Sequence, residues 1–177
     1  MKSNFIYIIS VLLLLSCVEP QARRPVAQKT ATVLSETIQQ KKELIASENK
    51  FIEGYLAKDS VNTYKTSPFG FWYTYISKIE NDARSPKIGD KIELEYTITD
   101  LNNVVIYTKE ELGVKNYIVD KEDFIPGLQE GVKLMKVGET ITFVIPSYRA
   151  FGLVGDANKI GINQTIKSTV TLLKIKE

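Results

Sequence analysis

Residues 91–100 read KIELEYTITD, and the regular alternation of apolar and polar side chains in this segment constrains the fold more than any other feature of the chain. Successive side chains of an extended strand point to opposite faces, so the apolar residues share one face and the polar residues share the other. The apolar face comprises Ile92, Leu94, Tyr96 and Ile98. A strand of this kind is typical of an antiparallel sheet that is covered on one side.

Further segments have a strand-like composition and are separated by turn residues. They are 69–79, 104–107, 116–119, 139–146 and 165–175. The pattern predicts roughly five strands in hairpin-like succession. Residues 126–135 predict one short helix between two of them, with Pro126 in its first turn. The expected fold class is therefore α+β, with an antiparallel sheet and a helix on one of its faces.

The predicted short helix contains two interior glycines, Gly127 and Gly131. A glycine in a helix interior is about 1 kcal/mol less favourable than an alanine. Two such residues indicate that something approaches the helix closely at these positions. A neighbouring strand and a ligand are the two candidates.

An N-terminal helical segment is predicted over residues 33–65, with the helix itself at 33–57. Its apolar side chains recur at helical spacing and are Leu34, Ile38, Ile45, Ile52 and Leu56. One interpretation is that this stripe packs against the chain's own domain, and the other is that it forms a dimer with a second copy. We favour the first, because the stripe is short and is interrupted by Lys41 and Lys42.

Residues 1–16 have the features of a secretory signal peptide, with a lysine near the start and an apolar run too short to span a bilayer. The sequence LLSC at 14–17 resembles the lipobox of bacterial lipoproteins, which implies lipidation of Cys17. The alternative is a plain secretory signal with an incidental cysteine. Residues 17–32 are polar and contain two prolines, as expected for a flexible tether.

The chain has no histidine and a single cysteine among its 177 residues. These counts exclude Ser-His-Asp and Cys-His catalysis and a Cys/His zinc site. With 23 basic and 21 acidic side chains the formal net charge is +2, which gives no reason to expect a nucleic-acid partner. We expect no metal and no cofactor, and a chemistry that needs little proton transfer or relies on carboxylates and tyrosines.

Three ordered blocks carry a resemblance to a known family. They are GDKIELEYT at 89–97, FIPGLQEGV at 124–132 with Met135 and Val137-Gly138 after it, and IP at 145–146 followed by AFG at 150–152. With these blocks, residues 66–177 resemble the FKBP-type peptidyl-prolyl cis-trans isomerases. The resemblance implies an antiparallel five-stranded sheet curled around one short helix.

The resemblance also implies isomerisation of X-Pro peptide bonds in a pocket between the sheet and the helix, without covalent or acid-base catalysis. It implies catalytic roles for Tyr96, Ile125 and Phe151, with the Ile125 N–H as a donor to a substrate carbonyl. The substrate-binding residues that it implies are Ile106, Tyr107, Tyr117, Phe124, Leu128, Ile160 and Ser168.

Several positions depart from the family's usual pattern. Tyr107 stands where an aspartate is usual, Ser168 replaces a phenylalanine, and Phe151 lacks the hydroxyl of the usual tyrosine. Lys115 stands where the pocket entrance usually has an aromatic residue. Because loss of one positioned polar group costs roughly 3 kcal/mol in an active site, we expect weak or altered isomerase activity. The alternative is an FKBP-like chaperone or a structural docking lipoprotein.

The lipobox, the tether, the helix and the sequence SPFGFWYTYI at 67–76 together resemble the FKBP-like lipoproteins that are associated with gliding motility in gliding bacteria. This resemblance implies a protein of the cell envelope, anchored by lipid at Cys17 and facing the periplasm from the outer membrane. Its expected partners are proline-containing segments of envelope or gliding-machinery proteins.

Overall fold

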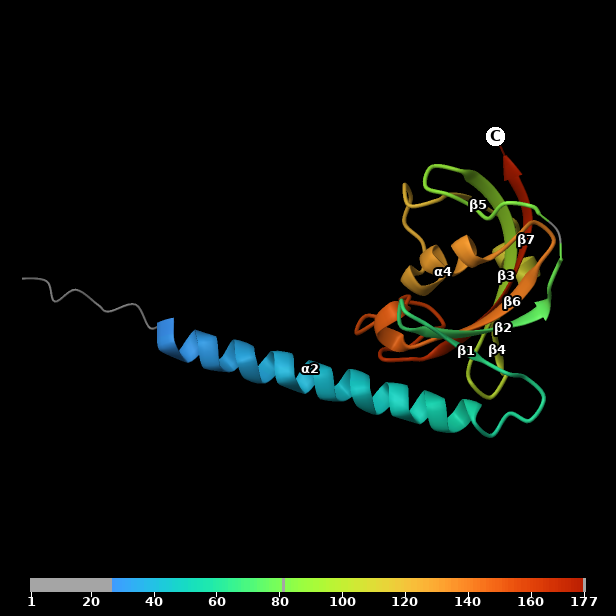
Figure 1. The fold of residues 1–177 in the computed structure, drawn as a ribbon. Helices are drawn as coiled ribbons and strands as arrows, with labels where there is room; N and C mark the ends of the chain where they lie inside the picture. The colour runs from blue at the N-terminus through green and yellow to red at the C-terminus, as the bar shows by residue number, and fades with distance from the viewer. Residues whose placement is uncertain (1–26, 81, 177) are drawn as a thin grey trace, which may run out of the picture. The chain divides into compact units, whose positions relative to one another are not determined.

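The computed structural model describes residues 27–80 and 82–176 (Figure 1). Its strands are β1 (Lys65–Ser67), β2 (Phe71–Ser77), β3 (Lys91–Thr99), β4 (Val105–Tyr107), β5 (Lys115–Ile118), β6 (Thr140–Ile145) and β7 (Ile166–Lys176). They form a seven-stranded sheet in the order β1-β2-β6-β7-β3-β4, and β5 also pairs with β3. Every pairing is antiparallel. The predicted α+β class is therefore confirmed.

The predicted number of about five strands is too low. Strand β1 comes from a turn-rich segment, and it pairs with β2 through Lys65↔Tyr73 and Ser67↔Phe71. The short strands β4 and β5 both pair with β3. Strand β5 pairs with the first half of β3, and β4 pairs with its last residues. The segments 104–107 and 116–119 were predicted as strands and correspond to β4 and β5, whereas β1 has only three residues, which are too few to show an alternation.

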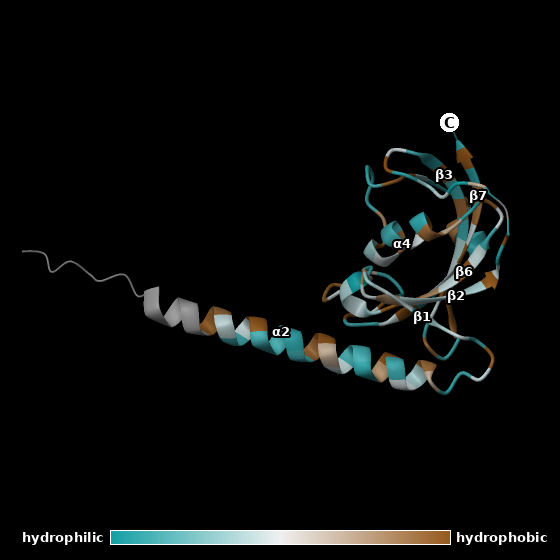
Figure 2. Ribbon diagram, in the orientation of Figure 1, coloured by the Kyte–Doolittle hydropathy of each residue, from teal (hydrophilic) through white to brown (hydrophobic). Residues whose placement is uncertain are grey.

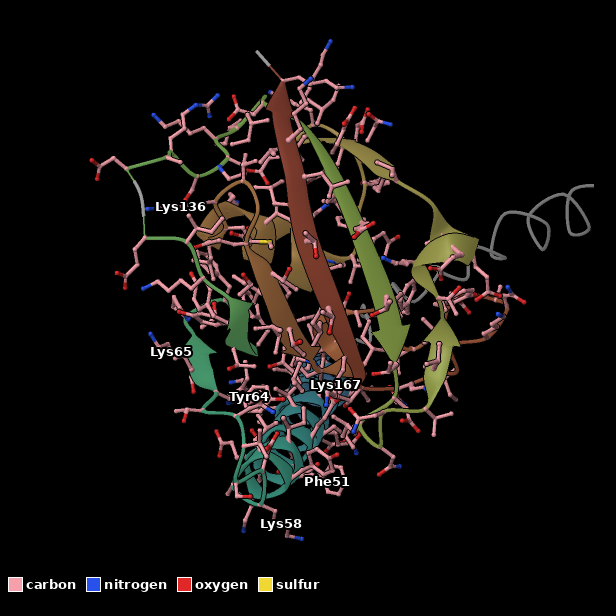
Figure 3. The ribbon with its side chains drawn as sticks, turned by 90° about the vertical axis from the view of Figure 1, so that its right-hand side faces the viewer. Phe51, Lys58, Tyr64, Lys65, Lys136 and Lys167 are labelled. Atoms are coloured by element: carbon pink, nitrogen blue, oxygen red, sulfur yellow. The ribbon has the colours of Figure 1, made fainter. Side chains whose placement is uncertain are left out.

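The longest strands, β3 and β7, lie side by side at the centre of the sheet (Figure 3). Along β3 the side chains of Ile92, Leu94 and Ile98 are buried, whereas Glu93 and Glu95 on the opposite face are partly exposed. The alternation in 91–100 therefore does mark a strand with one covered face. Tyr96 lies on the covered face but remains half-exposed, which leaves it accessible at the edge of the core.

The short helix predicted at 126–135 is present as α4 (Pro126–Gly131), which continues into the 3-10 helix η1 (Val132–Leu134). Figure 1 shows α4 on one face of the curved sheet. A Cβ atom added to Gly127 would lie 2.6 Å from Cγ2 of Ile145, and one added to Gly131 would lie 2.7 Å from Cε1 of Phe143. The closely approaching group is therefore strand β6, and the glycines allow the helix to contact it directly.

The main core fills the space between α4 and the sheet. Leu128, Val132 and Met135 from the helical side are fully buried. They belong to the same cluster as Phe71 and Phe143, whose rings pack edge to face with centroids 5.7 Å apart. This packing fixes the position of α4 and so of the residues that precede it.

The long helix α2 spans Ala27–Leu56. It begins inside the predicted tether 17–32, because AQKTAT at 27–32 contains neither glycine nor proline and continues the helix. The chain divides into two compact units, 1–41 and 42–177, so the second half of α2 belongs to the same unit as the sheet.

Within that second unit, Ile52 and Leu56 of α2 are buried against Trp72 and Val144. This half of the helix therefore packs on its own domain. Apolar residues recur along α2 in Figure 2, and two of those in the second unit, Leu44 and Phe51, remain exposed. Within the described part of the chain, no helix is both long enough and apolar enough to cross a membrane. The predicted signal peptide 1–16 and Cys17 lie outside the described residues.

Two further short helices flank the functional region. Helix η2 (Ser147–Arg149) follows β6, and helix α3 (Lys109–Leu112) follows β4. Helix α3 was not expected from the sequence, although Thr108 and Glu111 form a capping box: the Thr108 hydroxyl accepts from the Glu111 N–H at 3.2 Å, and the Glu111 carboxylate accepts from the Thr108 N–H at 3.0 Å. The motif was present in the sequence and would have identified this helix.

Candidate functional site

A cavity of about 490 Å³ opens between the covered face of the sheet and the start of α4. Its lining comes from β3, β4, α3, the residues that begin α4, and the loop that follows η2. The lining residues are Tyr96, Ile98, Tyr107, Leu112, Asp123, Phe124, Ile125, Pro126, Ala150, Phe151 and Asp156. The structure thus brings together five residues that were predicted from distant parts of the sequence, namely Tyr96, Tyr107, Phe124, Ile125 and Phe151.

Aromatic rings form one wall of the cavity. The ring of Phe124 packs edge to face on Tyr96, with centroids 5.5 Å apart, and lies 5.3 Å from the ring of Tyr117. The ammonium of Lys115 is 5.8 Å from the centroid of Phe124. Burial raises the pKa of the Tyr96 hydroxyl, so this group stays neutral at physiological pH. The wall is therefore apolar, and the Tyr96 hydroxyl on it is neutral. The ring of Phe124 is held in place by its contacts with Tyr96 and Tyr117.

Ile125 supplies a backbone donor at this wall. It is the N-cap of α4, and its carbonyl accepts hydrogen bonds from the N–H groups of Leu128 and Gln129 at 2.8 and 2.9 Å. No acceptor among the described residues is recorded for its own N–H. The side chain is buried, so the backbone at this point is fixed by its surroundings. A fixed and unused N–H beside an apolar cavity can bind a ligand carbonyl without reorganisation.

The cavity also holds the carboxylate of Asp156, which was not among the site residues expected from the sequence. The Tyr107 hydroxyl donates to Oδ2 of Asp156 at 2.5 Å, and Nδ2 of Asn158 donates to the same hydroxyl at 3.0 Å. The other oxygen of Asp156 accepts from the N–H groups of Asn158 and Ile160, at 2.9 and 2.8 Å. The loop after η2 thereby places a carboxylate next to position 107, where the family resemblance implies an aspartate and this chain has Tyr107.

The hydrogen bond to Asp156 is the main cause that raises the pKa of the Tyr107 hydroxyl. For Asp156, burial opposes ionisation, but the hydrogen bonds from Tyr107 and from the Ile160 and Asn158 N–H groups outweigh it and lower the pKa of the carboxyl. The two shifts favour the same state, a neutral tyrosine that donates to an ionised aspartate.

Nothing in the local sequence identifies Asp156 as part of the site. Its position depends on a tight return of the loop at Gly155, which has a φ of +71°. A Cβ atom there would lie 2.3 Å from the carbonyl oxygen of Ile160, so only glycine fits. Lys159 adds a contact at the tip of the loop, where its ammonium lies 2.6 Å from Glu111 and 4.8 Å from the centroid of Tyr107.

The remaining predicted residues lie outside the lining. Tyr117, Leu128, Ile160 and Ser168 are all buried in the core behind the cavity, and Ile106 is half-buried and packs against that core. The Ser168 hydroxyl donates to the carbonyl of Thr97 at 2.9 Å, within the sheet. In the structure these side chains support the cavity wall and do not form its surface.

A second hollow, of about 550 Å³, lies between α2 and the turn after β3, with Glu48, Phe51, Tyr55 and Asp100 in its lining. It contains none of the predicted site residues. Among the residues that the structure describes, no group of three or more Cys, Asp or Glu side chains is placed to hold a metal ion. The cavity around Phe124 is therefore the candidate site.

The Tyr107–Asp156 bond should make the loop insensitive to pH over a wide range. A lowered pKa of Asp156 means that its contribution to stability is fully present above about pH 3.9, the ordinary pKa of an aspartate, and is lost as the pH falls from there through the lower pKa of the folded state. A raised pKa of Tyr107 means that its contribution is present below about pH 10 and is lost at higher pH. We expect the proton chemical shift of the Ile160 amide, measured by NMR, to stay constant from about pH 5 to 9 and to titrate below that range.

The variant Asp156→Asn serves as the control for this titration, because it removes the carboxylate that accepts from the Ile160 N–H. The acid transition of the Ile160 amide should disappear in this variant. A wild-type midpoint at or above about 3.9 would contradict the proposed arrangement.

Comparison with known proteins gives matches over the region that contains this cavity. Residues 82–173 match the family model described as "FKBP-type peptidyl-prolyl cis-trans isomerase". The "Probable FKBP-type peptidyl-prolyl cis-trans isomerase FkpA" of Neisseria meningitidis serogroup B is 34% identical over 125 residues, which are 71% of this chain and 44% of that protein. The "Outer membrane protein MIP" of Legionella longbeachae is 28% identical over 110 residues, 62% of this chain and 46% of that protein. The chain thus spans less than half the length of these curated relatives.

Two solved structures share the fold. A peptidyl-prolyl cis-trans isomerase from Pseudomonas syringae pv. tomato superposes with a TM-score of 0.60 at 18% identity, covering 77% of this chain and 96% of that one. FkpA from Escherichia coli superposes with a TM-score of 0.60 at 24% identity, covering 99% of this chain and 82% of that one. At these identities the likeness concerns the fold.

Proposed function

Because this chain belongs to the FKBP-type peptidyl-prolyl cis-trans isomerase family, we propose that its cavity catalyses rotation about X-Pro peptide bonds. The observation that supports this best is the combination of an apolar aromatic cavity with the unused Ile125 N–H at its wall. The chain has no histidine, and the reaction needs none, since no proton moves and no bond to a side chain forms.

The rotation barrier, about 18–20 kcal/mol, arises from amide resonance. In the twisted state this resonance is lost, so the carbonyl carries less negative charge and the amide is less dipolar than when planar. An apolar cavity walled by Phe124, Tyr96 and Phe151 disfavours the planar, dipolar form relative to the twisted one. The Ile125 N–H orients the substrate carbonyl, and the side chains around it hold the proline ring.

The role of the Ile125 N–H can be separated from that of its side chain. Ile125 has a φ of −59°, which lies in the range of proline, so Ile125→Pro removes the N–H at a position whose own φ suits the new residue. Ile125→Ala removes a similar part of the side chain but keeps the N–H. We expect kcat/KM for an X-Pro peptide to be about 10-fold or more lower in Ile125→Pro than in Ile125→Ala.

An isomerisation assay of residues 18–177, run by NMR exchange on a Leu-Pro peptide, tests both proposals. Catalysis by the wild-type protein supports the isomerase function. A wild-type rate at background, with the peptide still bound, would instead assign the alternative function of a proline-binding chaperone or docking domain. Equal rates for Ile125→Pro and Ile125→Ala would exclude the donor role while leaving the isomerase function intact.

We also propose that the protein is anchored in the cell envelope through lipid on Cys17 and acts on proline-containing segments of envelope proteins, including gliding-machinery proteins. The support is the lipobox-like LLSC at 14–17, together with a relative described as an outer membrane protein. Cys17→Ser should move the protein from the membrane fraction to the soluble fraction. Membrane association that is unchanged in Cys17→Ser would argue against the anchor.

A further inference from the structure

The loop between β6 and β7 carries Phe151 and Asp156 to the cavity, and both of its ends meet one side chain of α2. Oε1 of Glu48 accepts hydrogen bonds from the Ser147 N–H and from the Thr165 hydroxyl, both at 2.6 Å. Oε2 of Glu48 accepts from the Ser147 hydroxyl at 2.8 Å. One carboxylate therefore joins the residue that begins the loop to the residue that ends it.

These bonds belong to the stronger class of hydrogen bonds, because the acceptor is a carboxylate and the contacts are short. Ser147 is buried, so without Glu48 its N–H and hydroxyl would lose their partner within the protein. Next to Glu48, Asn49 accepts a hydrogen bond from the Tyr148 hydroxyl at 3.1 Å, which adds a second contact between α2 and the start of the loop.

The tip of the loop, between its two ends, is held independently of α2. Asp156 accepts from Tyr107, and Lys159 pairs with Glu111, so the tip is attached to β4 and α3. Only the base of the loop depends on α2. Glu48 also lies outside the segment 82–173 that matches the family model, so the contact is an addition to the matched domain.

We infer that Glu48 is a positioning residue, which fixes both ends of the 147–165 loop against α2 beside the last β6–β7 pair, Ile145↔Ile166, and thereby keeps Phe151 and Asp156 at the cavity. Through this contact, helix α2 sets the geometry of the site without touching its lining. The consequence for turnover rests on the proposed isomerase function, whereas the structural coupling between Glu48 and the loop does not.

The test uses the full chain with the variant Glu48→Ala and the matched control Glu53→Ala, which removes the same charge from an exposed position of the same helix. The direct readout is amide hydrogen exchange. The N–H of Gly152, which donates to the Ser147 carbonyl at 2.8 Å, and the N–H of Asn163, which donates to the Gly152 carbonyl at 2.8 Å, report on the loop. Amides of β6 and β7 report on the sheet.

In Glu48→Ala we expect loop amides to exchange about 10-fold faster or more, with sheet amides unchanged within about twofold. Trp72 fluorescence should stay as in the wild type, because Ile52 and Leu56 still pack on that ring. For an X-Pro peptide, the factor by which KM rises should be several times the factor by which kcat falls, because the loop is displaced and the Ile125 donor is not. Glu53→Ala should change none of these values.

Thr165→Val provides a second variant that leaves α2 untouched. If Glu48 acts by joining the loop ends, the double variant Glu48→Ala/Thr165→Val should speed loop exchange no more than Glu48→Ala alone. Multiplicative effects would overturn the inference, as would unchanged loop exchange in Glu48→Ala. An equal acceleration of loop and sheet amides would also overturn it, because Glu48 would then act on global stability. The outcomes of the exchange experiment are readable even in a protein without isomerase activity.

Discussion

Replacing Phe124 with alanine is expected to lower kcat/KM for an X-Pro peptide by about 100-fold, the scale of effect that follows when a reacting group is misplaced by about 1 Å. Phe124 contributes its ring to the cavity wall and also holds Tyr96 in place, with ring centroids 5.5 Å apart. Alanine removes both contributions and admits water to the site, which weakens the preference for the less dipolar twisted amide.

Phe69 offers a matched control for this experiment. It is also a phenylalanine, but its side chain is exposed and it is not part of the cavity lining. Phe69→Ala should leave kcat/KM unchanged. Thermal unfolding of both variants should accompany the kinetics, because a loss of activity that follows unfolding says nothing about the wall. A folded Phe124→Ala protein with wild-type turnover would show that the chemistry takes place elsewhere.

The second large effect is expected at Gly131, where alanine should lower the free energy of unfolding by about 1–3 kcal/mol. Helix propensity alone predicts the opposite sign, since alanine is about 1 kcal/mol better than glycine in a helix. The contact with β6 decides the outcome, because the new Cβ would lie 2.7 Å from Cε1 of Phe143, a ring that is fully buried.

Two variants make this prediction specific. Gly54 lies in α2 with nothing within 4 Å of the position of a Cβ, so Gly54→Ala should raise the free energy of unfolding by up to about 1 kcal/mol. Phe143→Leu shortens the side chain that Gly131→Ala meets, so the double variant should be less destabilised than the sum of the two single variants. Urea denaturation gives all four values. A stabilised Gly131→Ala protein would mean that α4 and β6 are less closely packed than the structure has them.

The elements that were predicted well are those whose physical cause is local. The alternation of 91–100 depends only on neighbouring residues and one covered face, and β3 spans Lys91–Thr99. The two glycines of α4 likewise predicted that another group approaches this helix closely, and that group is strand β6. Strand β1 was not predicted, because three residues are too few to show a periodic pattern. Its pairing with β2 becomes evident only in three dimensions.

The candidate site divides in the same way. Phe124, Ile125 and Phe151 stand in contiguous motifs, so the sequence identified them, and all three line the cavity. Asp156 and Glu48 could not be found this way. Asp156 reaches the cavity through the return of a loop at Gly155, and Glu48 meets Ser147 and Thr165 from a helix that lies far away in sequence. Such contacts carry no local signal, because the partner residues are ordinary serine, threonine and tyrosine side chains.

The order of the strands has a consequence for how the chain folds. Strand β7 is the last strand along the chain, yet it lies between β6 and β3 and pairs with both. During synthesis, β1, β2 and β6 on one side and β3, β4 and β5 on the other have no common partner until β7 has emerged. Such non-local pairing slows folding and leaves strand edges uncovered in the growing chain. A ribosome-bound chain that lacks residues 166–176 should therefore remain sensitive to protease along its whole sheet, and protection should appear in a single late step.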